Sequence, residues 1–126
     1  MKNKKLVLIT IALIISTNIE AKWKLIHKSM EGKVFIDDEF IQLSSNQLKV
    51  IVYEDLTFPR LEKIKSIQHL IEINCINNQW IARRSIFYSD KNLQGETIAD
   101  VSDITDWTEI DQDSYPFTIK KKYCKK

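Results

Sequence analysis

The segment 66–76 alternates between apolar and polar side chains with a period of two, which is the pattern of a β-strand rather than of a helix. One face consists of Ile67, His69, Ile71, Ile73 and Cys75, and the other of Ser66, Gln68, Leu70, Glu72 and Asn74. Successive side chains of a strand point to opposite sides, so Cys75 is expected to point into the core with the isoleucines. The chain must therefore build a sheet that buries this face.

Other short runs rich in Val, Ile and aromatic residues predict further strands on both sides of this segment. They are 22–28, 33–38 with a continuation over 40–43 after a bend, 48–58, 80–88 and a weaker run at 96–101. In the first run, Trp23, Leu25 and His27 are expected to share a face. In 80–88, one face is expected to hold Trp80, Ala82, Ile86 and Tyr88. Pro59 predicts the end of the third run, because proline has no N–H for a sheet ladder.

The last segment predicts a helix rather than a strand. Asp111 to Ser114 supply capping side chains, and Pro116 suits a first turn, where its missing N–H needs no partner. The expected apolar face comprises Pro116, Phe117, Ile119, Tyr123 and Cys124. We therefore expect a closing C-terminal helix that lies on the sheet and is pinned to it through Cys124 and Cys75.

Residues 1–21 have the three-part pattern of a secretory signal peptide. Three lysines precede the apolar run 6–15, and a polar stretch then ends at Ala21, where cleavage is expected. The run is shorter than the roughly 20 residues that cross a bilayer, although an uncleaved N-terminal anchor helix is the alternative. The expected mature domain, 22–126, keeps 16 basic and 16 acidic residues, so it has no net charge and no membrane span. No Cys lies near the cut, so acylation there is not expected.

The two cysteines, Cys75 and Cys124, both remain after cleavage. An exported protein enters an oxidising compartment, where an even number of cysteines predicts a disulfide. This bond would close a loop of 49 residues, which corresponds to about 4 kcal/mol in the chain-entropy model. The alternatives are two free thiols or a metal site, but the chain lacks the closely spaced Cys or His pairs of a zinc site.

Composition argues against several classes of function. Two glycines are too few for a phosphate-binding loop or a dinucleotide fingerprint, and a net charge of +2 is low for a nucleic-acid binder. Strand alternation explains the pair Arg83-Arg84 better than a nucleic-acid surface does. His27 and His69 lie on apolar strand faces, where a lone histidine is more often a core residue than a ligand. We expect no catalytic residue, no metal and no cofactor, and therefore not an enzyme.

A cluster of lysines ends the chain. It consists of Lys120, Lys121, Lys122, Lys125 and Lys126. These side chains could bind anionic lipid, sulfated glycans or an acidic protein surface, and a C-terminal lysine suits lysine-binding sites such as those of kringle domains. The alternative is a solvated helix end whose cations compensate the helix dipole.

The ordered set of short motifs resembles the surface-adhesin protein E family of Gram-negative bacteria. The residues that carry the resemblance are Phe35-Ile36-Asp37, Ile41, Ser66, Glu72-Ile73-Asn74-Cys75, Arg83 to Tyr88, Gly95, Trp107-Thr108-Glu109-Ile110, Ser114 and Cys124. The resemblance implies an α+β fold, in which an antiparallel sheet of about six strands carries a C-terminal helix tethered by a disulfide. It also implies export, dimerisation, and in some members binding to host matrix proteins. The lipidation cysteine and long N-terminal extension of some members have no counterpart here.

Two functions follow from these observations. The first is an exported, non-enzymatic adhesin-like protein that contacts host extracellular-matrix proteins or other extracytoplasmic proteins. The alternative is a periplasmic domain that binds a small ligand or a partner protein between sheet and helix. Both place the protein in the periplasm or at the cell surface. A homodimer through a sheet edge is compatible with either function.

Overall fold

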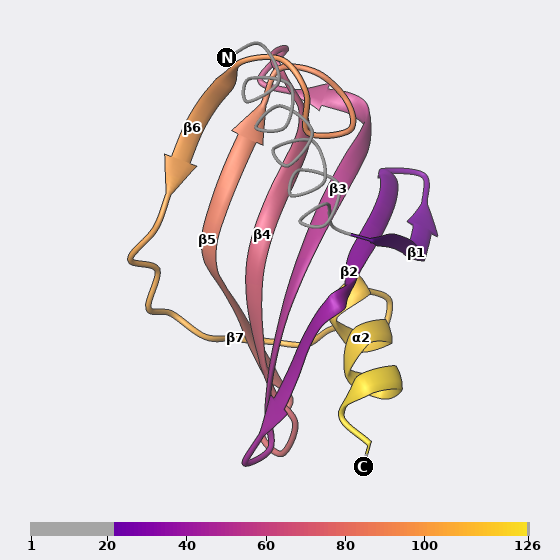
Figure 1. Ribbon diagram of the computed structural model, residues 1–126, viewed down its shortest axis with the longest axis vertical. Helices are drawn as coiled ribbons and strands as arrows, with labels where there is room; N and C mark the ends of the chain where they lie inside the picture. The colour runs from indigo at the N-terminus through magenta and orange to yellow at the C-terminus, as the bar shows by residue number, and fades with distance from the viewer. Residues whose placement is uncertain (1–21, 126) are drawn as a thin grey trace, which may run out of the picture.

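The computed structural model describes residues 22–125, so the predicted signal peptide and Lys126 lie outside the described residues. The chain forms one antiparallel sheet that carries a short C-terminal helix (Figure 1). The elements are β1 (Trp23–Ser29), β2 (Gly32–Ser44), β3 (Gln47–Arg60), β4 (Ile64–Asn74), β5 (Gln79–Tyr88), β6 (Thr97–Val101), β7 (Thr108–Glu109) and α2 (Tyr115–Tyr123). The prediction of an antiparallel sheet with a C-terminal helix is confirmed, although the fold is mostly β.

Strands β1 to β6 are hydrogen-bonded in the order of the sequence, and the short β7 pairs with β5. Tight turns make this order possible. Ser45 and Asn46 join β2 to β3 with φ values of 51° and 67°, as a two-residue hairpin requires. Leu61 and Glu62, with φ values of 50° and 62°, begin the turn from β3 to β4. The sheet is therefore a simple meander whose strand ends lie at two opposite ends of the molecule.

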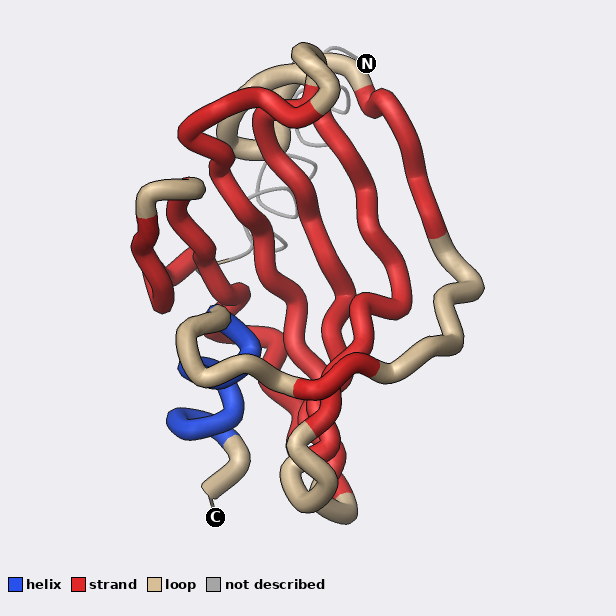
Figure 2. The backbone as a smooth tube through the Cα atoms, turned by 180° about the vertical axis from the view of Figure 1, so that it is seen from behind, coloured by secondary structure: helices blue, strands red, loops and turns tan. Residues whose placement is uncertain are grey.

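One face of the sheet, which we call the helix face, is buried beneath α2. In the register of β3 and β4, Leu48 lies opposite Ile73 and Val50 opposite Ile71, and all four side chains are fully buried. Ile119 of α2 joins this cluster and is also fully buried. Figure 2 shows the segment before the helix crossing this side of the sheet, with α2 at its end near β1 and β2. The predicted core face of 66–76 is thus confirmed.

Two β-bulges change the side-chain phase that the alternation predicts. In β1, Leu25 pairs with Phe35 and His27 with Val34, so Ile26 is an extra residue that packs against the core. Leu25 is 47% exposed, and the prediction that it shares a face with His27 is wrong. A bulge shifts the register by one residue and therefore turns the following side chains to the other face.

In β5 the extra residue is Arg83, because Leu70 pairs with Arg84 and Ile71 with Ala82. Trp80 and Ala82 therefore lie on the helix face, whereas beyond the bulge Ser85 and Phe87 take that face. The expected common face of Trp80, Ala82, Ile86 and Tyr88 is wrong for its second half.

The bend predicted at 37–39 coincides with an interruption of the ladder between Ile36 and Ile41, but β2 continues through it. Likewise β3 extends to Arg60 rather than ending before Pro59. Its ladder to β4 is interrupted between Asp55 and Arg60. Pro59 thus occupies a stretch where no N–H has to be donated to that neighbour.

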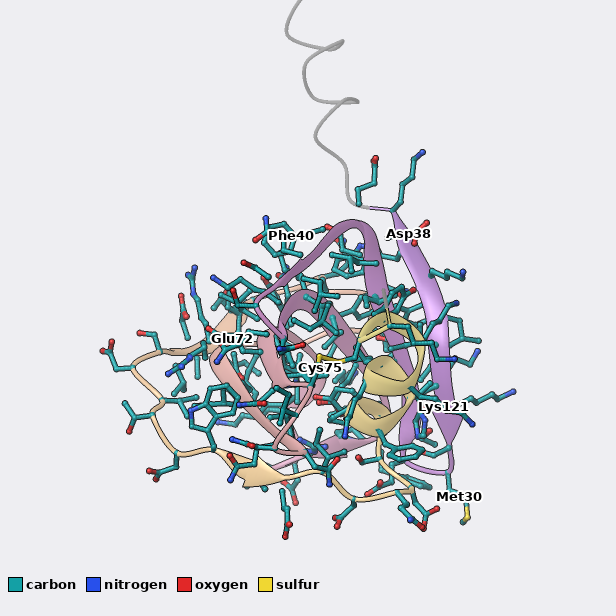
Figure 3. All side chains as sticks on the ribbon, turned by 90° about the horizontal axis from the view of Figure 1, so that it is seen from below. Met30, Asp38, Phe40, Glu72, Cys75 and Lys121 are labelled. Carbon is teal, nitrogen blue, oxygen red and sulfur yellow. A yellow bond between two sulfur atoms is a disulfide. The ribbon has the colours of Figure 1, made fainter. Side chains whose placement is uncertain are left out.

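The predicted disulfide joins Cys75, next to the end of β4, to Cys124, the residue after α2, with a Cα–Cα distance of 5.8 Å. Figure 3 views this bond along the strands. A nine-residue helix is marginal by itself, since isolated helices shorter than about 12 residues are unstable in water. The bond fixes the C-terminal end of α2, while buried Pro116 and Ile119 fix its sheet-facing side.

Replacing both cysteines by alanine should lower the free energy of unfolding by about 4 kcal/mol, because the unfolded chain regains the entropy of the 49-residue loop. Equilibrium urea denaturation measures this difference. Wild-type protein kept reduced with dithiothreitol should show the same loss, and equal stability of all three samples would contradict the structural role of the bond.

Candidate functional site

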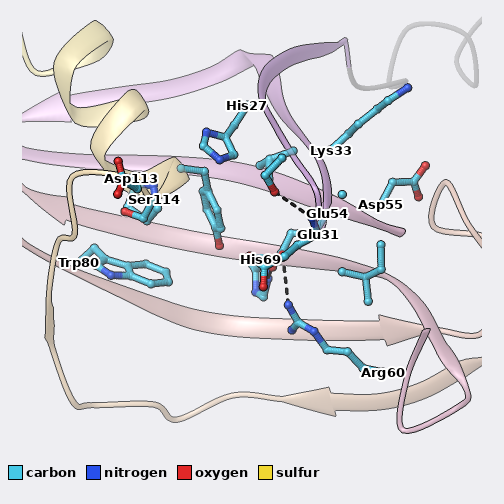
Figure 4. Close-up of a pocket in the computed structure, with 16 residues that line it drawn as sticks. His27, Glu31, Lys33, Glu54, Asp55, Arg60, His69, Trp80, Asp113 and Ser114 are labelled. Atoms are coloured by element: carbon cyan, nitrogen blue, oxygen red, sulfur yellow. Dashed lines mark hydrogen bonds and ion pairs between the residues drawn. The ribbon is translucent and has the colours of Figure 1, made fainter. Parts of the chain in front are cut away.

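A pocket of about 410 Å³ lies between the N-terminal end of α2 and the helix face of the sheet (Figure 4). Its apolar walls come from Val34, Leu56, Trp80, Tyr115 and Pro116. The titratable side chains that line it include His27, Glu54, Arg60 and His69. The pocket exists because α2 covers only part of the helix face. The part of this face beyond the N-terminal end of α2 is not covered by the helix.

A chain of three hydrogen-bonded side chains runs inward from this pocket. His69 Nε2 lies 2.6 Å from Glu54 Oε2, and His69 Nδ1 lies 2.7 Å from Ser85 Oγ. The three residues come from adjacent strands: β3 supplies Glu54, β4 supplies His69, and β5 supplies Ser85 directly opposite His69. The register of the sheet therefore brings them together, and Arg60 Nη2 adds a longer ion pair of 3.6 Å to Glu54.

The carboxylate of Glu54 stays charged despite its burial. Burial alone would raise its pKa, but the hydrogen bond from His69 and the positive charges of His69 and Arg60 together lower it below the ordinary value of 4.5. Burial raises the pKa of Tyr115 well above 10.0, and the negative charge of Glu54 raises it further. At neutral pH the pocket therefore presents an anionic carboxylate beside a neutral phenol.

The order serine, histidine and carboxylate matches the members of a nucleophilic triad, but its orientation is reversed. In a triad the serine oxygen faces the substrate, and the carboxylate supports the histidine from behind. Here Glu54 and His69 line the pocket, while Ser85 is 5% exposed and lies behind His69. In this arrangement Glu54 can contact a ligand in the pocket, whereas the Ser85 hydroxyl is not placed to attack one as a nucleophile.

The lysine cluster predicted as a binding site is divided by the structure. Lys120 is partly buried, and its Nζ donates to Asn78 Oδ1 at 2.9 Å in the turn between β4 and β5. Lys121, Lys122 and Lys125 are exposed, and Lys126 lies outside the described residues. Lys120, Lys121 and Lys125 border a shallow groove of about 370 Å³ whose floor is formed by Phe117 and Cys124. The role of these lysines in binding stays a prediction.

The adjacent arginines are engaged in ion pairs. Arg83 Nε donates to Glu72 at 3.0 Å, and its guanidinium lies 5.4 Å from the ring centroid of Trp107. Arg84 forms two hydrogen bonds with Asp100, of 3.0 and 2.6 Å. Each arginine of the Arg83-Arg84 pair thus has an acidic partner within the same molecule.

Within residues 22–125, no three His, Cys, Asp or Glu side chains are grouped so that they could hold a metal ion. The same part of the chain contains no helix that is long and apolar enough to cross a membrane. The expectations of no metal, no cofactor and no catalytic residue stay predictions.

Glu54 and Ser85 were not recognisable as partners of His69 in the sequence. In the alternation of this strand, Glu54 falls on the same face as Leu48, Val50 and Val52. A charged residue on an otherwise apolar face was therefore the one sign in the sequence that Glu54 has a buried partner. For Ser85 the bulge at Arg83 hides that signal, because the alternation assigns Ser85 to a face it does not occupy.

Comparison with known proteins agrees with this fold. A family model described as surface-adhesin protein E matches residues 23–125. The solved structure of Haemophilus influenzae protein E is similar, with a TM-score of 0.56 and 15% sequence identity. That similarity covers 84% of this chain and 86% of the other. No curated protein matches the sequence.

The lowered pKa of Glu54 predicts a specific acid sensitivity. A carboxylate with a lowered pKa stabilises the folded state fully above its ordinary value of 4.5, and this contribution is lost as the pH falls through the folded value. Glu54→Gln should therefore lower stability by about 1–3 kcal/mol at pH 7 and flatten the decline of stability below pH 4.5.

Urea denaturation between neutral and acidic pH measures both effects. Glu62→Gln, which removes an exposed carboxylate in the turn between β3 and β4, is the matched control and should keep the wild-type pH dependence. An unchanged acid slope in the Glu54 variant would show that this carboxylate is not held as described.

Proposed function

The chain belongs to the surface-adhesin protein E family, and on that basis we propose that it is an exported, non-enzymatic binding protein that contacts host extracellular-matrix proteins or other extracytoplasmic proteins. The observation that carries the proposal is the family match, which extends over residues 23–125. The signal peptide expected at residues 1–21 supplies the export that such a role needs.

The disulfide and the arrangement of Ser85, His69 and Glu54 support an extracytoplasmic binding protein. Disulfides such as Cys75–Cys124 typically form and persist in oxidising compartments, and this one ties α2 to the one face of the sheet that the helix covers. The reversed orientation of Ser85, His69 and Glu54 supports a binding role rather than a hydrolytic one.

The pocket supports a second candidate function, a domain that binds a small ligand between sheet and helix. Its volume of about 410 Å³ falls in the range of small-molecule sites, and the anionic Glu54 supplies an orienting group. Native mass spectrometry of protein purified from its own cells would detect such a ligand. Under this candidate the protein resides in the periplasm and has no adhesive role.

Protease treatment of intact cells separates the two locations. A surface adhesin should disappear from intact cells at protease levels that leave a periplasmic marker protein undigested. If the protein is lost only after the outer membrane is permeabilised, it is periplasmic and the adhesive proposal fails.

Binding to a panel of immobilised matrix proteins tests the adhesive role directly. The purified exported protein should bind at least one member of the panel and should not bind serum albumin. If the protein is found at the cell surface but binds no member of the panel, matrix adhesion is rejected, and contact with another extracytoplasmic protein is the part of the proposal that survives.

A further inference from the structure

One end of the molecule joins three segments that are far apart in the sequence, and we call it the cationic end. It consists of the turn between β2 and β3 (42–49), the turn between β4 and β5 (73–79) and the C-terminal part of α2 with the residues after it (120–125). Both hairpin tips and the end of the helix point to the same end in Figure 1.

Direct contacts hold these segments together. Cys75 N donates to Asn46 O at 2.9 Å, which links the two turns. The disulfide from Cys75 to Cys124 and the hydrogen bond from Lys120 to Asn78 link the second turn to the helix. The cationic end is therefore a defined surface rather than a loose tail.

The charges of this end have one sign. Its lysines are Lys49, Lys120, Lys121, Lys122 and Lys125, and none of the three segments contains Asp or Glu. Two carboxylates border it: Glu72 lies opposite Lys49 in the register of β3 and β4 and accepts from Arg83 at 3.0 Å, and Glu109 lies in β7 opposite Gln79. Since residues 22–126, the chain expected after cleavage, have no net charge, the cationic end is a local concentration of charge created by the fold.

The two turns of the cationic end carry neutral hydrogen-bonding side chains. The exposed ones are Gln42, Ser44, Ser45, Asn46, Gln47 and Asn77. Several of them border a groove of about 440 Å³ that also includes Lys49 and Glu72. Amide and hydroxyl groups both donate and accept, so they suit a partner that is rich in hydroxyl groups as well as in charge.

We propose that the cationic end binds a linear sulfated polysaccharide of the glycosaminoglycan type. Its sulfate groups would pair with Lys121, Lys122 and Lys125, and its hydroxyl and amide groups would meet the neutral side chains of the two turns. A lipid surface fits less well, because the turns present mainly amides and hydroxyls. Binding to a lipid surface needs an extensive apolar face, whereas Ile76, 70% exposed, is the one large apolar side chain that is exposed among the described residues of this end. The partner is thus a polysaccharide, beyond the protein partner proposed above.

The experiment uses the purified exported protein and immobilised heparin as the probe. We expect salt-sensitive binding that is lost when the heparin is replaced by desulfated heparin, which keeps the sugar backbone. The triple variant Lys121→Gln, Lys122→Gln and Lys125→Gln should bind heparin about tenfold or more weakly than wild type.

The matched control is the triple variant Lys28→Gln, Lys63→Gln and Lys91→Gln, which removes the same charge from exposed positions outside the cationic end. It should bind heparin like wild type. Thermal unfolding and non-reducing peptide mapping establish that both variants keep the fold and the disulfide.

If both triple variants lose heparin binding equally, net charge alone accounts for the binding and the proposal is overturned. Absence of heparin binding, or tighter binding to vesicles containing phosphatidylglycerol than to heparin, would also overturn it. These outcomes leave the adhesive proposal intact, since the matrix-protein panel and the protease treatment test that proposal separately.

Discussion

The covalent tether between Cys75 and Cys124 is the constraint on which the rest of this structure depends. A single antiparallel sheet cannot bury a core alone, and the element that covers it is a helix of only nine residues. The tether fixes the end of that helix, so that Ile119 stays in the cluster formed by Leu48, Val50, Ile71 and Ile73. The core is therefore complete only while the helix is held in place.

Both surfaces proposed for binding depend on the same placement of α2. At its N-terminal end, α2 contributes Tyr115 and Pro116 to the pocket that Glu54 and His69 line. At its C-terminal end, the disulfide to Cys75 and the hydrogen bond from Lys120 to Asn78 hold α2 beside the turn between β4 and β5. One short helix thus borders the pocket lined by Glu54 and His69 at one end and the lysine-rich surface at the other.

Sequence patterns predicted the elements that depend on local chemistry. The alternation in 66–76 located β4 and its core face, and the cysteine pair predicted the tether. Two predicted faces were wrong, and a bulge explains both: the extra residue Ile26 separates Leu25 from His27, and the extra residue Arg83 precedes the second half of β5, so the phase reverses in each strand. The contacts between Glu54, His69 and Ser85 were beyond prediction because they depend on the register of three strands, which the spacing of residues within one strand does not determine.

Native-state hydrogen exchange of the backbone amides of α2 is the most direct test of this account. In the oxidised protein the amides of Ile119 and Lys120 should exchange as slowly as those of β3 and β4. After both cysteines are replaced by alanine, the helix amides should exchange much faster than the β3 and β4 amides of the same variant. Equal protection of helix and sheet in that variant would show that packing alone holds the helix, and it would contradict the central role given to the tether.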